Sequence, residues 1–82
     1  MRQIKLIWDF RGPDAKNIAK HHSIHLKEYI KIEKLTDCFS GVEDINELHA
    51  IAFMIIYEDK MKFFRDALKP HRAVLHKAQN EA

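Results

Sequence analysis

Cysteine, glycine and proline are scarce in this chain of 82 residues, which contains one cysteine, two glycines and two prolines. A single thiol, Cys38, excludes an intramolecular disulfide and a metal cluster built from cysteines alone. One cysteine is also typical of a reducing compartment, and residues 1–5 contain no apolar signal-peptide core. We therefore expect a cytoplasmic protein.

Long apolar runs and an excess of one charge are also missing. The longest apolar run, residues 50–57, is far below the roughly 20 residues that a membrane helix needs. The 14 Lys and Arg residues are nearly balanced by 12 Asp and Glu residues, and neither sign forms a long block. Because nucleic-acid binders usually carry a strongly basic face, we expect no nucleic-acid partner and no membrane partner.

What the chain does contain is a composition that folds around a core. Apolar residues make up 46% of the sequence, so residues 1–82 are expected to form one domain, with residues 77–82 as a polar, frayed tail. A domain of this size buries only roughly 60% of the surface of its unfolded chain. Self-association is a common remedy for so small a core.

Two segments have the pattern of strands at the centre of a sheet. In residues 2–10, every second residue from Ile4 to Phe10 is apolar, which predicts a strand with one buried face. Residues from 48 or 49 to 57 are apolar on both faces, as is typical of a central strand.

Weaker patterns predict two further strands. Residues 36–47 are compatible with a short edge strand in which Gly41 marks a bulge or a bend. Residues 72–76, after the last proline, are long enough for a final short strand.

Two amphipathic segments between these strands predict helices. Residues 13–35 contain no glycine or proline after Pro13, and their core-facing residues recur at helical spacing on a stripe that includes His22. Asp59 is expected to cap a second helix, and Pro70 is expected to end it.

The resulting β-α-β-β-α-β order resembles the ferredoxin-like fold, including its dimeric α+β barrel relatives. The resemblance rests on the order and lengths of the elements and not on a sequence motif. It implies an α+β sandwich, a four-stranded antiparallel sheet with two helices on one face. The opposite face of the sheet would then be apolar and open, which predicts a homodimer through the open sheet face.

In that topology, four segments meet at one edge of the domain: the end of the first strand, the start of the first helix, the hairpin before the third strand and the end of the second helix. We call the six residues that they bring there the polar end: Asp9, Arg11, His22, His49, His71 and Arg72. The polar end predicts a small-ligand site, with Arg11, His49, His71 and Arg72 as ligand-binding candidates for a small anion. In the alternative, Arg11 pairs with Asp9 or Asp14 and binds no ligand.

Six histidines in 82 residues raise the possibility of a divalent metal. His21 and His25 are one helical turn apart, so both can face one ion. The full set of metal-ligand candidates is His21, His22, His25, His49 and His71. Neither the zinc-protease motif nor the di-iron motif is present, and the alternative is a set of histidines without a ligand.

Catalysis is a further hypothesis, because His22 or His49 beside Asp9 would form an acid-base pair for proton transfer, as in a small enzyme of the dimeric α+β barrel kind. Asp9 shares its strand face with Lys5 and Ile7, however, and a carboxylate that points away from the helices would be explained by a salt bridge. A third hypothesis is an interaction module without a ligand site. The chain has no glycine-rich phosphate loop, no nucleophilic-serine elbow and no paired-carboxylate signature.

Overall fold

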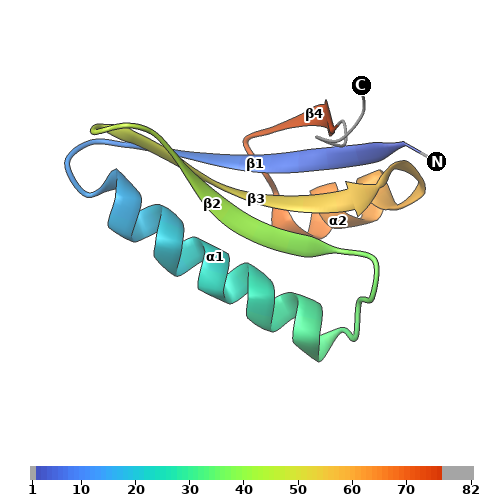
Figure 1. Cartoon of the computed structure of the whole chain (residues 1–82). Helices are drawn as coiled ribbons and strands as arrows, with labels where there is room; N and C mark the ends of the chain where they lie inside the picture. Colours follow the sequence, from blue (N-terminus) through green and yellow to red (C-terminus); the bar gives the residue numbers. More distant parts are fainter. Residues whose placement is uncertain (1, 77–82) are drawn as a thin grey trace, which may run out of the picture.

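The two strongest strand patterns pair with each other at the centre of one sheet. In the computed structural model, which describes residues 2–76, β1 (Gln3–Arg11) runs antiparallel to β3 (His49–Tyr57), with Gln3 opposite Tyr57 and Arg11 opposite His49. β2 (Phe39–Asn46) and β4 (Arg72–His76) flank this pair, giving the order β2-β3-β1-β4 with every neighbouring pair antiparallel (Figure 1). The tail expected at residues 77–82 lies outside the described residues.

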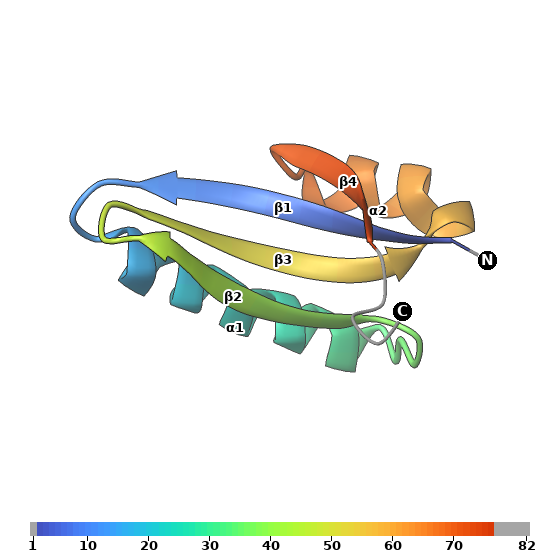
Figure 2. The ribbon, with the colours of Figure 1, turned by 45° about the horizontal axis from the view of Figure 1, so that its top comes forward.

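Both helices cover the same face of the sheet. α1 (Ala15–Ile32) lies behind the β2 side, and α2 (Met61–Leu68), preceded by the short helix η1 (Glu58–Lys60), lies behind the β4 side (Figure 2). Leu26 of α1 and Phe64 of α2 join one core with the inward side chains of β1 and β3. The buried members of that core are Ile4, Leu6, Trp8, Leu26, Ala52, Met54, Ile56 and Phe64. The predicted α+β class is confirmed, and the topology is compatible with a ferredoxin-like arrangement.

The first helix is shorter than the prediction of residues 13–35, because its last turn closes in a Schellman motif. Lys34 adopts a left-handed conformation with φ of 56°, its N–H donates to the carbonyl of Lys31, and the N–H of Leu35 donates to the carbonyl of Ile30 at 3.0 Å. Glycine is the usual residue at such a position, since a Cβ is strained there. Because a lysine stands in place of the glycine, the sequence does not indicate that the helix ends here.

Two other local predictions were wrong. Asp59 does not cap α2, because residues 58–60 form η1 and the helix begins at Met61 without a side-chain cap. The irregularity of β2 lies between Asp44 and Asn46, not at Gly41. Gly41 instead lies beneath the ring of Phe53, where an added Cβ would come within 2.8 Å of the ring.

The face of the sheet away from the helices is less open than the sequence predicts. Ile7, Ile51 and Ile55, which point to this face, are buried within the single chain. The ammonium group of Lys5 lies 4.5 Å from the ring centre of Phe53 and also pairs with Glu43.

Phe39 and Val74, at opposite edges of this face, are exposed, whereas the centre is partly covered by the chain's own charged side chains. The homodimer through this face stays a prediction, and it has a smaller apolar surface to bury than the alternation of β1 and β3 indicates.

Candidate functional site

A carboxylate at the end of β1 organises the polar side of the sheet. Asp9 is opposite Ile51 in β3 and shares the face of Lys5 and Ile7, so its side chain points away from the helices. Its side chain is 17% exposed. A carboxylate this shielded is stable only when hydrogen-bond donors replace the lost water.

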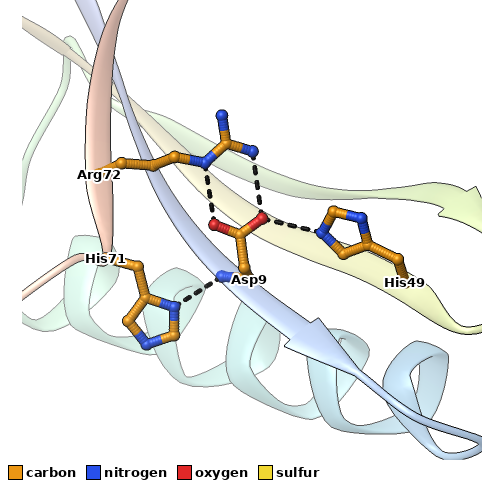
Figure 3. A network of polar contacts seen from close by, with 4 residues as sticks. All are labelled: Asp9, His49, His71 and Arg72. Carbon is orange, nitrogen blue, oxygen red and sulfur yellow. Dashed lines mark hydrogen bonds and ion pairs between the residues drawn. The ribbon is translucent and has the colours of Figure 1, made fainter.

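Arg72 supplies two of these donors. It is the first residue of β4 and lies opposite Ile7, which places its side chain diagonally across from Asp9. Its Nε donates to Oδ2 of Asp9 at 2.9 Å and its Nη2 donates to Oδ1 at 3.1 Å (Figure 3). This two-point geometry matches the planar guanidinium to the planar carboxylate and fixes the orientation of both.

His49 supplies the third contact from the opposite side of Asp9. It is the first residue of β3, and its Nε2 lies 2.9 Å from Oδ1 of Asp9 (Figure 3). The side chain of His49 is 12% exposed. Because the contact uses Nε2, Nδ1 is the ring nitrogen that remains for a ligand or a proton.

His71 holds the main chain of the same residue. Its Nδ1 accepts a hydrogen bond from the backbone N–H of Asp9 at 2.8 Å, and the backbone N–H of His71 donates to the carbonyl of Ile7 at 2.9 Å. An imidazole nitrogen accepts only when it carries no proton, so Nε2 of His71 bears the ring hydrogen in this arrangement. We call Asp9, His49, His71 and Arg72 the Asp9 network.

The charges of the network keep Asp9 ionised. The hydrogen bonds from Arg72 are the largest cause, and with the contact to His49 they outweigh partial burial and lower the pKa of Asp9 from 3.8 to about 2. The carboxylate in turn raises the pKa of Arg72. At neutral pH, the network therefore contains a fixed negative charge between two basic side chains.

The residues of the polar end predicted from the sequence do not all lie on one face of the sheet. His22 lies on the helix side, with its ring centre 4.9 Å from that of Trp8 and 5.6 Å from that of Phe10. Burial is the main reason that the pKa of His22 is lowered below 6.5. His22 and Asp9 therefore lie on different faces of the sheet, whereas His49 contacts Asp9. Catalysis by either histidine stays a prediction.

Arg11 lies on the same face as Asp9 and opposite His49, and its side chain is exposed. Among the ion pairs of residues 2–76, none involves Arg11, so the expected pair with Asp9 or Asp14 is not found. Arg11 thus provides a cation opposite His49 that the Asp9 network does not use.

The metal-ligand candidates come together only in part. Nε2 of His21 and Nε2 of His25 lie 3.1 Å apart on the exposed side of α1, and Nδ1 of His25 lies 3.7 Å from Glu28. His49 and His71 belong to the Asp9 network instead. Within residues 2–76, no group of three or more His, Cys, Asp or Glu side chains is arranged to hold a metal ion. The divalent metal stays a prediction.

Sequence reasoning missed a pocket at the other end of β3. It lies between residues 34–38, Tyr57 and the start of α2, and Phe63 and Phe64 of α2 line it. The adjacent pair of phenylalanines was the available signal for this pocket, because only one of two successive helical residues can face the core and the other ring has to lie elsewhere.

No helix within residues 2–76 is both long enough and apolar enough to cross a membrane. The chain has no significant match among protein-family models, curated protein sequences or solved structures. Any function assigned to it therefore has to come from its own residues.

Proposed function

We propose that this chain is a small-ligand-binding domain that holds a carboxylate or phosphate group on the sheet face, between Arg11, His49 and Arg72. One observation supports the proposal above all others. Asp9 accepts hydrogen bonds from Arg72 and contacts His49 at the same time, so a single shielded carboxylate holds two basic side chains in fixed positions.

The donors that Asp9 leaves unused are suited to an anion. A guanidinium has five N–H groups, and Arg72 spends only two of them on Asp9. Nδ1 of His49 and the exposed guanidinium of Arg11 lie on the same face. Arg11, Arg72 and Asp9 sum to a net charge of +1 even when His49 is neutral, and this sign favours an anionic ligand.

The fixed positions of these side chains are the second support for the proposal. Side chains that are already held in place lose less conformational entropy when a ligand binds. Arg72 is half-exposed, so salt and water weaken its attraction for an anion, and we expect an affinity in the millimolar rather than the nanomolar range.

Titration with inorganic phosphate and, separately, with acetate tests this function. At constant ionic strength, both anions are expected to shift the NMR signals of His49 and Arg72 to saturation. Arg72→Gln should weaken binding by about tenfold or more, because it removes a charged donor that the neutral amide replaces only weakly.

Arg65→Gln is the matched control. Arg65 of α2 is 52% exposed against 50% for Arg72, and it also lies beside an aspartate, Asp66. Equal losses in the two variants, or shifts that never saturate, would show that the anions act only by general screening.

A second candidate function is proton transfer by His49. The distance of 2.9 Å between Nε2 and Asp9 favours it, because the contact fixes the ring and leaves Nδ1 to exchange a proton with a substrate. The proposed anion site would hold the carboxylate of a keto acid beside that nitrogen.

The test is deuterium exchange into the methyl group of pyruvate in D₂O, followed by proton NMR. Exchange above the buffer rate is expected for the wild type and for His21→Gln, whose histidine lies on the exposed side of α1, and is expected to be lost in His49→Gln. Exchange at the buffer rate in the wild type removes this candidate and leaves anion binding untouched.

A further inference from the structure

A pocket of about 810 Å³ opens at the end of the sheet opposite to the Asp9 network. β3 spans the distance between the two, since His49 begins this strand and Tyr57 ends it. The pocket is bounded by residues 34–38 on one side and by η1 and the start of α2 on the other. Its volume lies in the range of roughly 300–1,000 Å³ that is typical of small-molecule sites.

Two neighbouring phenylalanines line one side of the pocket. Phe64 is buried in the core, while Phe63, one residue earlier on α2, is 58% exposed. Their ring centres are 5.2 Å apart at an angle of 74°. Leu35 adds an aliphatic wall, and Tyr57, the last residue of β3, borders the pocket. Exposure of a phenylalanine costs free energy unless something covers it, and a flat apolar ligand against Phe63 would do so.

The rim of the pocket carries no net charge. Lys34 and Lys60 contribute two positive charges, and Asp37 and Asp59 contribute two negative charges. Cys38, which also lines the pocket, is a neutral thiol, because burial followed by the charge of Asp37 raises its pKa. Such a rim attracts neither an anion nor a cation over distance, in contrast to the net positive face around Asp9.

The wall formed by residues 34–38 is set by the backbone. The Schellman motif fixes Lys34 in its left-handed conformation and ties Leu35 to Ile30 of α1. The hydrophobic contact that accompanies this motif places Leu35 and Ile30 against the core. A pocket that exists before the ligand arrives requires little further ordering on binding.

We infer that this pocket binds an uncharged, largely aromatic small molecule, with its ring system against Phe63 and Phe64 and its hydrogen-bonding edge toward the charged rim. The site is separate from the proposed anion site. Each can therefore fail without the other.

The uncharged fluorescent dye N-phenyl-1-naphthylamine is a suitable probe. We expect saturable binding at one dye per chain with a blue-shifted emission. Phe63→Ala should raise the dissociation constant by about tenfold or more, since buried aromatic anchors carry much of the binding energy of a site. Leu48→Ala is the matched control, because Leu48 is 57% exposed but lies in the turn before β3, at the other end of the sheet.

Cys38 reports where the dye binds. It is the only cysteine of the chain, and it lines the pocket. We expect saturating dye to slow the reaction of Cys38 with the uncharged reagent 4,4'-dithiodipyridine by fivefold or more, while inorganic phosphate leaves both the dye affinity and this rate unchanged.

Three results would overturn the inference: no saturable dye binding, equal affinity of Phe63→Ala and wild type, or an unchanged rate for Cys38 at saturation. The anionic dye 8-anilinonaphthalene-1-sulfonate tests the ligand class. If it binds more than tenfold tighter than the uncharged dye, the pocket selects anions and the assignment is wrong.

Discussion

Trp8→Ala is expected to lower the free energy of unfolding by about 3–5 kcal/mol, because it removes a large buried ring and leaves a cavity that the sheet and helices cannot fill. The net stability of an 82-residue domain is roughly 4–12 kcal/mol. Urea unfolding followed by circular dichroism measures the change. The indole Nε1 also donates to the carbonyl of Leu68 at 3.3 Å, so the variant releases the end of α2 that leads into His71 and Arg72.

Two variants separate the contributions of Trp8. Trp8→Phe keeps most of the ring and loses the hydrogen bond to Leu68, for which we expect a cost of about 1–2 kcal/mol. Phe63→Ala, at an aromatic residue that is mainly exposed, should cost less than about 1 kcal/mol. A loss below about 1.5 kcal/mol in Trp8→Ala would contradict the central place of this residue in the core.

Asp9→Asn is expected to lower the free energy of unfolding by about 1–2 kcal/mol at neutral pH. The change removes the charge that receives hydrogen bonds from Arg72 and contacts His49, and the amide cannot accept from both sides. Because Arg72 is half-exposed, solvent screens its share, and we place the expected value at the lower end of charged hydrogen bonds.

The stabilisation by Asp9 is expected to decrease as the pH falls. The pKa of Asp9 is about 2 in the folded chain against 3.8 ordinarily, so the unfolded chain takes up the proton first as the solution is acidified. The stabilisation by Asp9 is therefore complete above about pH 4 and is lost as the pH falls toward 2. Unfolding curves between pH 2 and pH 5 should show this loss in the wild type and not in Asp9→Asn.

Asp66→Asn is the control for the aspartate. Asp66 is 63% exposed and lies 3.6 Å from Arg65, so its loss should change stability by no more than about 0.5 kcal/mol. If Asp9→Asn and Asp66→Asn behave alike, the Asp9 network contributes nothing beyond an ordinary surface pair.

The pattern of apolar residues is sufficient to predict the centre of this fold. Residues 2–10 were predicted as a strand from a period of two, and residues from 48 or 49 to 57 from apolar residues on both faces. The two strands, β1 and β3, pair along their whole length. The same period predicts the direction of Asp9, since a residue on the face of Lys5 and Ile7 has to point away from the helices. The salt bridge weighed as an alternative for Asp9 is the arrangement observed.

Features that depend on contacts between distant segments could not be predicted in this way. The helical stripe places His22 against the sheet, while the strand period places Asp9 on the other face. The two residues were grouped in one polar end because the helical and the strand periodicities were not compared. The pocket arises because residues 34–38 meet α2, which begins more than 20 residues later. No local sequence pattern indicates that these two distant segments come into contact.

The unequal lengths of β1 and β4 have a consequence for association between chains. β4 has five residues and β1 has nine, so within residues 2–76 the end of β1 that carries Asp9 extends past its neighbour. A bare strand edge of this kind is a template on which a second chain can add and aggregate. The imidazole of His71 occupies the free amide of Asp9, and the guanidinium of Arg72 lies over the same margin. These two side chains thus also cover the stretch of β1 edge that β4 leaves unpaired, so that a second chain cannot add to it there.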